Sequence, residues 1–452
     1  MPNVPNQSDS LIEPIYTTRR ANDAIVLGSS GITITSKGIE IGCSGEATLR
    51  LRPRLKLVVV AHVPEESAVQ SFGLFGSGPV TLKFGERSPP TQSLVLNYRD
   101  SARGPAQIEL TPNPQDLAIY TSRRARLNSV IFHVMNFPKF LGGDDVRWRS
   151  GQGDNRLLGR VALNEKDWLT EIQELPRTKE LVGELQTEGG YGITHVGRLT
   201  RGERGFSISE AERVLRELHL FLSFARGSWT PLVLPVGFDA DGNRAYEQWG
   251  LSLGTPWEPR VSWFDIHHGH SLAVLYPGFT ALLRNGDLGK AASSAIYWYL
   301  RSNRAGEGAG VDSGVILSQA ALERLTSACL AHLGLSQKGS PSSRFVRAWQ
   351  ALKLPIGIPR GAQLVSRARR KENWSNAAEA LTAVRNDLVH PQGRLKAPVG
   401  RFVAEIWRLA QWYVELTLLR LSGYDGPYTN RLRSRWVGEV ENVPWATRRI
   451  RS

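Results

Sequence analysis

The stretch Asn376-Ala-Ala-Glu-Ala-Leu-Thr-Ala-Val-Arg-Asn-Asp-Leu-Val-His390 has the composition of a single helix. Asn376, with Glu379 three residues later, forms a capping-box pattern at its start. The alanines and the leucine that follow have a strong helical preference. Pro391 ends the helix, because the residue before a proline is pushed out of the α region. We therefore predict that His390 lies at the C-terminal end of this helix.

The last turns of this helix carry Arg385, Asn386 and His390. Asn386 and His390 are four residues apart and share one face. Histidine titrates near neutral pH, and a helix C-terminus favours its protonated form. Arg385 can clamp a phosphate through paired hydrogen bonds, while Asn386 can orient the imidazole ring or the phosphate. This set suits attack by a ribose 2′-hydroxyl that leaves a 2′,3′-cyclic phosphate, so the predicted substrate is RNA. In the alternative interpretation, Arg385 and His390 only cap the helix and bind surface groups.

The hexapeptide from Arg385 to His390 resembles the signature of the HEPN superfamily. In that signature an arginine, usually followed by a polar residue, precedes a histidine by four to six intervening residues. Further segments in the second half of the chain are similar to ApeA-like anti-phage proteins, which carry a large N-terminal region before a C-terminal HEPN domain. These segments are Leu220–Phe224, Ala295–Leu300, Ala321–Leu325 and Leu421–Tyr428.

The resemblance implies a helical HEPN domain that cleaves RNA, tRNA included, without a metal or other cofactor. It also implies a homodimer in which two copies of the motif face one groove. The role would be antiviral defence by abortive infection, with a phage-derived trigger and the N-terminal region as sensor or regulator. In several HEPN families an upstream helix contributes an acidic residue, and Glu323 is the candidate here, holding Arg385 by a bidentate pair. In the alternative, Glu323 is an ordinary solvated helix residue.

Composition is that of a globular protein with an unusual excess of positive charge. The chain has 452 residues, 41% of them hydrophobic, and a formal net charge of +14. This charge favours a polyanionic partner, although an arginine-rich surface without such a partner is the alternative. Two cysteines cannot form a disulfide framework, and no apolar stretch reaches the length of a membrane span. We therefore expect a cytoplasmic protein without a membrane partner.

The chain divides by pattern into three regions, which predicts a multidomain α+β fold. Residues 1–141 contain short alternating strands separated by Gly and Pro clusters, which indicates a sandwich or a partly closed barrel. Residues 142–153, rich in Gly and Asp, are predicted to form a linker or an exposed loop. Residues 154–266 form an α+β region that continues the first or stands alone, with a helix that begins at the capping box Ser207–Glu210. Residues 270–452 are predicted to form an all-helical bundle with a basic C-terminal tail that starts near Tyr424.

Three other stretches invite a functional interpretation. Asp265-Ile-His-His-Gly-His270 resembles a metal-binding cluster, but adjacent histidines on an extended segment point opposite ways, so we expect no metal site. Arg123–Arg126 and Arg367–Lys371 are basic runs that are either solvated surface or part of an RNA track. The sequence thus predicts a metal-independent endoribonuclease. A nucleic-acid- or protein-binding module whose helical domain only dimerises is the alternative.

Overall fold

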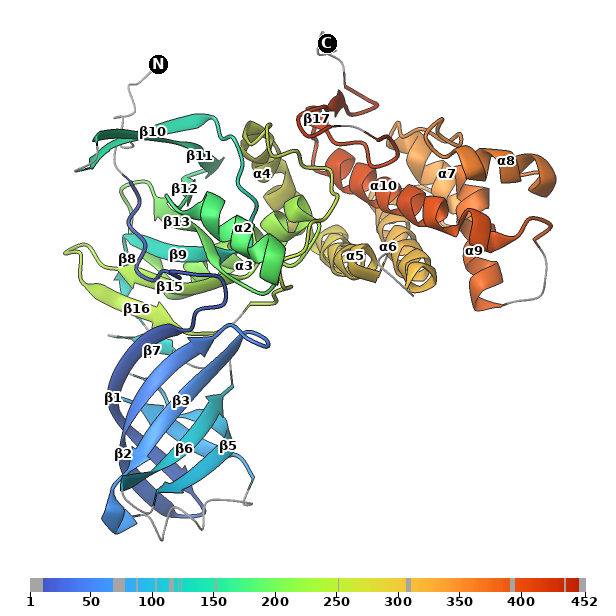
Figure 1. Cartoon of the computed structure of the whole chain (residues 1–452). Helices are drawn as coiled ribbons and strands as arrows, with labels where there is room; N and C mark the ends of the chain where they lie inside the picture. The colour runs from blue at the N-terminus through green and yellow to red at the C-terminus, as the bar shows by residue number, and fades with distance from the viewer. Residues whose placement is uncertain are drawn as a thin grey trace.

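Long antiparallel strands form the first part of the chain. We describe a computed structural model, in which the described residues are 11–67, 78–86, 88–101, 104–113, 118–120, 122, 124–150, 153–250, 252–305, 310–390, 395–434 and 436–446. Six strands form a closed barrel in the order β1-β2-β3-β6-β5-β4 (Figure 1). They are β1 (Ile25–Ser36), β2 (Ile39–Arg50), β3 (Lys56–Val63), β4 (Val80–Phe84), β5 (Thr91–Ser101) and β6 (Gly104–Pro112), with a short 3-10 helix η1 (Glu65–Ser67) after β3.

The barrel closes where β1 pairs with β4. Ile34 lies opposite Leu82 in this pair, and both side chains are fully buried. Val59 and Leu110 meet in the same way between β3 and β6 and also face the interior. Period-two alternation therefore fills a barrel interior, and the closed sheet leaves no free edge. Of the two predicted arrangements, the sandwich is wrong and the barrel is right, although it is fully rather than partly closed. Strand pairing, which the sequence pattern does not give, distinguishes the two.

An eight-stranded antiparallel sheet follows, in the order β10-β11-β12-β13-β9-β15-β16-β7. Its strands are β7 (Ala118–Tyr120), β9 (Ser129–Met135), β10 (Asp144–Ser150), β11 (Gly153–Glu165), β12 (Trp168–Glu174), β13 (Ile193–Arg201), β15 (Leu232–Phe238) and β16 (Arg244–Gln248). Two short strands, β8 (Arg126–Leu127) and β14 (Phe206–Ser207), pair beside it. Because β9 pairs with both β13 and β15, the predicted boundary at residue 141 does not separate two units. The predicted linker at 142–153 includes strand β10.

The segment before the barrel also packs on this sheet. The backbone N–H groups of Ile15 and Tyr16 donate to Nε2 of His133 on β9, at 3.1 and 3.0 Å. The N–H of Ile12 donates to Oε1 of Gln173 on β12, at 3.2 Å. The chain therefore contacts the eight-stranded sheet both before and after it forms the barrel.

Two helices, α2 (Thr178–Glu188) and α3 (Ile208–Arg226), accompany the sheet. The predicted capping box of α3 is confirmed, because Ser207 and Glu210 bond reciprocally. Gly227 ends α3 in the left-handed conformation, with φ of 74°. Phe221 and Phe224 of α3 contact Phe279 of α4, so α3 links the sheet to the helical region.

The C-terminal part is helical, as predicted, and it lies beside the sheet region in Figure 1. Its helices are α4 (His270–Leu283), α5 (Gly286–Ala305), α6 (Val311–His332), α7 (Pro341–Ala351), α8 (Gln363–Glu372), α9 (Ala377–Val389) and α10 (Val403–Leu421), with the 3-10 helix η2 (Val399–Arg401) before α10. Every residue from Leu409 to Leu419 of α10 is buried. The broad apolar stripe of that helix therefore forms the centre of the region, packed against α5, α6 and α9.

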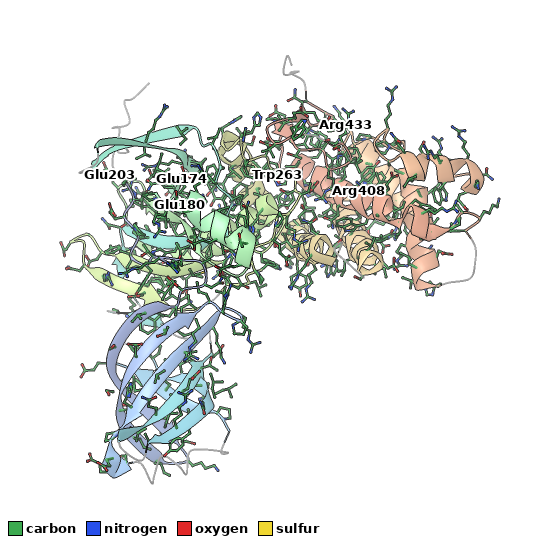
Figure 2. The ribbon with its side chains drawn as sticks, viewed as in Figure 1. Glu174, Glu180, Glu203, Trp263, Arg408 and Arg433 are labelled. Carbon is green, nitrogen blue, oxygen red and sulfur yellow. The ribbon has the colours of Figure 1, made fainter. Side chains whose placement is uncertain are left out.

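Buried charge and aromatic rings join the sheet region to the helices. Arg284, which caps the C-terminus of α4, contacts Glu217 of α3 at 2.6 Å and Glu165 at the end of β11 at 2.9 Å. Trp263, labelled in Figure 2, is fully buried at this junction and contacts Phe224 and Tyr424. The multidomain α+β prediction holds at this level. The sheet region and the helices share one continuous apolar core, whereas the barrel interior belongs to a second cluster.

The segment after α10 folds back onto the helices, and its short strands β17 (Pro427–Tyr428) and β18 (Glu441–Asn442) pair with each other. Arg431 in this segment is buried and forms an ion pair with Glu415 of α10. The predicted basic tail is therefore partly core rather than solvated. Arg433 of the same tail pairs with Glu441. Arg435 and residues 447–452, which carry Arg448, Arg449 and Arg451, lie outside the described residues.

Among the described helices, none combines the length and apolar character that a membrane span requires. Cys43 and Cys329 are both buried and unbridged. Burial raises the pKa of each thiol to about 11, so both are protonated and unreactive near neutral pH.

Candidate functional site

Helix α9 positions the candidate catalytic residues. Its N-cap Asn376 accepts a hydrogen bond from the N–H of Glu379 through Oδ1, at 3.0 Å. In a capping box the Glu379 carboxylate would accept from the N–H of Asn376. Here it accepts instead from the N–H of Ser375, one residue earlier, at 2.7 Å. Ala377, Ala380 and Leu381 are buried, so this part of the helix is fixed in the core.

The other end of α9 is exposed to solvent. His390 is the C-cap residue, and its N–H donates to the carbonyl of Asn386 at 2.8 Å. Nη1 of Arg385 donates to Oδ1 of Asn386 at 3.2 Å. Asn386 and His390 are exposed and Arg385 is half-buried, so all three side chains are accessible from solvent. The structure thus gathers the three residues at one accessible helix end, but no hydrogen bond joins the described His390 ring to Arg385 or Asn386.

Asp387, within the same motif, was not selected from the sequence. Its Oδ1 atom is buried and has no hydrogen-bond partner among the described residues. Buried polar atoms without a partner are rare, and they mark water sites or groups that change partner. In the sequence, only the position of Asp387 between Arg385 and His390 could have marked it as part of the site.

Glu323 lies on α6, one turn from Gln319. Nε2 of Gln319 donates to Oε1 of Glu323 at 3.2 Å, so the two residues share a face as their spacing indicates. No ion pair joins Glu323 to Arg385, although both residues are described. In this structure Glu323 therefore does not hold the arginine, and its assignment to the site stays a prediction.

A basic groove lies on another face of the same region, lined by α8, η2 and the residues beside them. It is a cavity of about 260 Å³ with apolar walls that include Leu364, Ala368 and Phe402. Its charged lining residues are Arg367, Lys371 and Arg401, and all three are exposed. No acidic residue lines the groove within the described part of the chain, so it is suited to an anion.

Helix α8 depends on a distant carboxylate for its start. Its N-cap Ala362 has no side chain that can accept a hydrogen bond. Instead Oε2 of Glu405, from α10, accepts from the N–H groups of Leu364 and Val365, at 2.8 and 3.0 Å. A carboxylate at a helix N-terminus is favourable because the first N–H groups lack partners and the helix dipole is positive there. The carboxylate fixes the start of the helix that carries Arg367 and Lys371.

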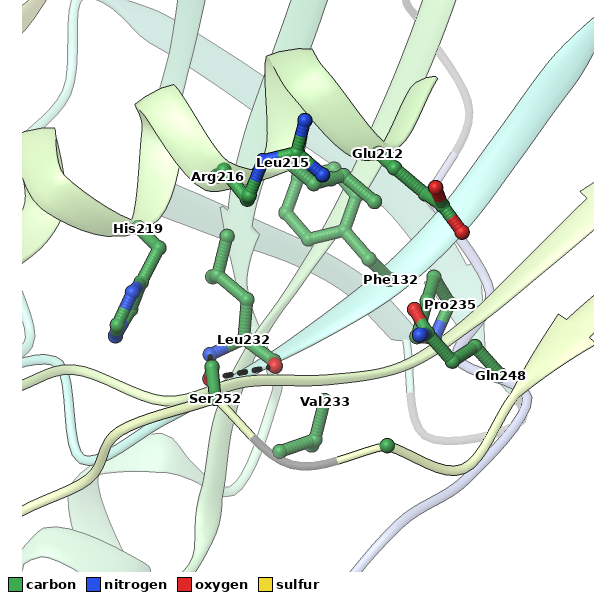
Figure 3. A pocket seen from close by; sticks show the side chains of 11 residues that line it. Phe132, Glu212, Leu215, Arg216, His219, Leu232, Val233, Pro235, Gln248 and Ser252 are labelled. Atoms are coloured by element: carbon green, nitrogen blue, oxygen red, sulfur yellow. Dashed lines mark hydrogen bonds between the residues drawn. The ribbon is translucent and has the colours of Figure 1, made fainter. Parts of the chain in front are cut away.

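A larger cavity of about 420 Å³ lies between α3 and strand β15 (Figure 3). Phe132, Leu215 and Leu232 form apolar walls, and the side chains of Glu212, Arg216 and Gln248 approach its rim. We call this space the α3–β15 cavity. The sequence analysis did not find it, because its residues come from β9, α3 and the segment from 232 to 252.

His219 borders the α3–β15 cavity as a neutral side chain. Its Nε2 lies 2.8 Å from the carbonyl oxygen of Leu253 and must carry a proton, since a carbonyl only accepts. Burial lowers the pKa of His219 to about 4, and the ring stacks on Trp229. His219 therefore offers an unprotonated Nδ1 near neutral pH.

Asp265 and His268, in the stretch Asp265–His270, contact neighbouring backbone groups. Oδ1 of Asp265 accepts from the N–H of His267 and Oδ2 from the N–H of Gly438, both at 2.8 Å. Nε2 of His268 lies 3.2 Å from the carbonyl oxygen of Gly438. The segment therefore anchors the C-terminal part of the chain. Across the described residues, no group of three or more His, Cys, Asp or Glu side chains is arranged to hold a metal ion.

The basic run Arg123–Arg126 is only partly within the described residues. Arg123 lies outside the described residues, while Arg126 donates to the carbonyl of Gly205 and joins the short β8–β14 pair. The run Arg367–Lys371 contributes Arg367 and Lys371 to the groove at α8.

Comparison with known proteins identifies relatives without an assigned function. Residues 122–260 match the YopA central domain, and residues 285–442 match the YopA C-terminal domain. The chain is 27% identical over 458 residues to the SPbeta prophage-derived uncharacterized protein YopA of Bacillus subtilis (strain 168), which covers 97% of this chain and 98% of that protein. No solved structure matches the chain. The central-domain match begins before residue 141, in agreement with the shared sheet.

Proposed function

We propose that this protein is a metal-independent endoribonuclease whose catalytic residues are Arg385, Asn386 and His390. The observation that carries the proposal is the exposed end of α9, where Arg385 and Asn386 are bonded and His390 caps the helix. The resemblance of this motif and its flanking segments to HEPN proteins supports the same assignment. Glu323 is retained as a supporting residue that would reach Arg385 only after a side-chain rearrangement.

In the proposed reaction the 2′-oxygen of a ribose bonds to the adjacent phosphorus, and the bond from phosphorus to the 5′-oxygen breaks. The proton of the 2′-hydroxyl passes to solvent or to the neutral imidazole of a second His390. A protonated His390 gives a proton to the departing 5′-oxygen. Arg385 stabilises the charged phosphorane through paired hydrogen bonds. The products are a 2′,3′-cyclic phosphate and a 5′-hydroxyl, and no water is consumed.

We propose further that the active form is a homodimer that brings two copies of the motif together. The relative from Bacillus subtilis is prophage-derived, which supports a role for this chain in conflict between phages and their bacterial hosts. In that role RNA cleavage would follow a phage-derived trigger, and the barrel and sheet region would restrain or release the nuclease.

The test is cleavage of an end-labelled RNA by the full chain, with the same sequence as DNA for comparison. We expect RNA alone to be cut, with cyclic-phosphate ends, and expect EDTA to leave the rate unchanged. His390→Ala and Arg385→Lys should each abolish cleavage, and Asn386→Ala should slow it less. Lysine keeps the charge of Arg385 but loses the planar fork.

The matched controls are His332→Ala and Arg324→Lys, which change an exposed histidine in the last turn of α6 and an exposed arginine on the same helix. Both should cut RNA like the parent. If His390→Ala melts like the parent and still cuts RNA at the parental rate, the motif is not the nuclease site.

A second candidate function, RNA binding without cleavage, is favoured by the three cations of the groove at α8. In that case the parent would bind RNA but not cut it, and changes at Arg385 and His390 would have no effect. Arg367→Ala with Lys371→Ala would weaken binding and reduce its salt dependence.

A further inference from the structure

We propose that the α3–β15 cavity is a binding site for a guanine nucleotide, separate from the motif on α9. Its volume of about 420 Å³ falls in the range of small-ligand sites. Phe132 is fully buried, and Leu215 and Leu232 are 9% exposed, so the walls are firmly packed. Ser252 closes the cavity by exchanging two hydrogen bonds with the backbone of Leu232, at 2.9 and 2.8 Å (Figure 3). Walls of this kind suit a flat heterocycle.

The polar side of the cavity is held in place by a buried tyrosine. The hydroxyl of Tyr246 lies 3.2 Å from Oε1 of Glu212 and 3.0 Å from Oε1 of Gln248, and it donates its single proton to one of these two acceptors at a time. Tyr246 is 1% exposed, so its own position is fixed. Two side chains from different elements, α3 and β16, are thereby positioned together before any ligand arrives. Such pre-organisation lowers the ordering cost of binding.

This pair matches the edge of guanine. The second carboxylate oxygen of Glu212 can accept from the N1–H and N2–H₂ groups of the base, and the amide nitrogen of Gln248 can donate to O6. Adenine is a poor fit, because its N1 is an acceptor and would face the carboxylate without a proton between them. Hydrogen bonds to a charged acceptor are stronger than neutral ones, so Glu212 should dominate the choice of base.

Arg216 supplies the charge that a phosphate needs. It lies one turn after Glu212 on α3, a spacing at which opposite charges usually pair. No ion pair joins these two described residues, because Glu212 is held toward Tyr246 and Arg216 is exposed. Figure 3 shows the guanidinium and the carboxylate set apart on the same rim. The neutral Nδ1 of His219 adds an acceptor suited to a ribose hydroxyl.

The ligand that meets these demands has a donor-rich planar base at one end and an anion at the other. Inorganic phosphate lacks the flat apolar body. A free aromatic amino acid has the two charges but leaves Gln248 without a partner. A nucleoside monophosphate, GMP, is therefore the probe.

The test is isothermal titration of the full chain with GMP, AMP and phenylalanine in buffer with EDTA. We expect GMP to bind at least about tenfold more tightly than AMP, since a single hydrogen bond to a charged group is enough for such a difference and AMP lacks both the N1–H and the N2–H₂ donors. Glu212→Gln should weaken GMP binding by at least about tenfold and reduce the ratio of the affinities for GMP and AMP. Arg216→Ala should weaken GMP but leave guanosine unchanged.

The control is Arg204→Ala, which removes an exposed arginine in the turn before β14 and should bind GMP like the parent. His390→Ala should also bind GMP normally, which keeps this site distinct from the nuclease motif. Thermal melting of each variant checks its fold. The assignment is overturned if GMP does not bind at millimolar concentration, or if AMP or phenylalanine binds as tightly as GMP or more tightly. It is also overturned if Glu212→Gln binds GMP with the affinity of the parent.

Discussion

Removal of Arg431 should destabilise the protein far more than removal of its neighbour Arg433. The guanidinium of Arg431 donates to Oε2 of Glu415 and to the carbonyl of Val261, both at 3.0 Å, and to the hydroxyl of Tyr299 at 3.1 Å. The side chains of Arg431 and Glu415 are 2% and 0% exposed. Burial lowers the pKa of Arg431, but the carboxylate of Glu415 outweighs this and leaves the pKa above its ordinary value. Arg431 is therefore charged in the core, and Glu415 is the carboxylate that it pairs with.

The expected cost follows from what Arg431→Ala leaves behind. Breaking a buried ion pair by removing one partner costs about 3–5 kcal/mol, because the other charge stays buried and uncompensated. In the exposed pair Arg433–Glu441 the side chains are 55% and 24% accessible, and such pairs contribute about 0–1 kcal/mol. In the double variant Arg431→Met with Glu415→Gln no charge remains, and the amide still bonds Tyr299. It should recover part of the loss.

The assay is thermal unfolding of the full chain followed by far-UV circular dichroism. A multidomain chain need not unfold in one step, so the midpoint of the helical transition is compared. At about 2–4 °C per kcal/mol for a unit of 150–250 residues, Arg431→Ala should lower this midpoint by roughly 6–20 °C. Arg433→Ala should lower it by at most about 4 °C. Similar midpoints for the two alanine variants would refute the reasoning, as would a double variant less stable than Arg431→Ala.

Two further predictions concern pH and packing. Burial lowers the pKa of His133 to about 4 and that of His195 to about 3, so below pH 6.5 the unfolded chain binds more protons than the folded chain. The free energy of unfolding is therefore highest above pH 6.5 and falls on acidification by about 1.4 kcal/mol per pH unit for each histidine. His195→Phe keeps the stacking on Phe140, and it should reduce the fall in melting temperature between pH 7.5 and 5. Gly278→Ala would place a Cβ atom 1.9 Å from the carbonyl oxygen of Ser422, whereas a Cβ atom at Gly183 would meet open space. In urea unfolding, Gly278→Ala should be less stable than the parent by about 1–3 kcal/mol, and Gly183→Ala should be more stable by about 0.5–1 kcal/mol. Equal urea midpoints for the two variants would contradict this description of the packing.

Local patterns in the sequence predicted the elements that carry their own signals. The capping residues Ser207 and Asn376 start α3 and α9 as expected, because an N-cap bonds to N–H groups only two or three residues away. A different local rule placed His390 at the end of its helix, since the residue before Pro391 is pushed out of the α region. Helix α8 was missed, because its start is capped by Glu405, about forty residues further along the chain. No local pattern reports such a partner.

The features that sequence reasoning missed arise from long-range pairing. Arg431 belongs to an arginine-rich segment, and its burial follows only from the position of Glu415 in α10. Strand β9 precedes residue 141, yet its partners β13 and β15 lie about 60 and 100 residues later. The α3–β15 cavity likewise collects Phe132, Glu212 and Gln248 from three elements. Residue propensity and hydrophobic periodicity predict single helices and strands. They do not predict which distant residues pair with them, because that depends on the tertiary structure.

The register of the barrel has a consequence for how the protein can change over evolution. Ile25 pairs with Leu49, Leu49 pairs with Leu57, and Thr111 bonds the carbonyl of Leu57. The first residue of β1 and the last residues of β6 therefore lie at the same end of the barrel, three strand spacings apart along its wall, an arc of roughly 14 Å. Since the chain contacts the eight-stranded sheet on both sides of the barrel, the barrel is an inserted module tethered at two points. Two tethers restrict its rotation relative to the sheet more than one linker would. Another small domain in its place would need adjacent ends and an apolar face to cover the sheet residues that share the barrel's core.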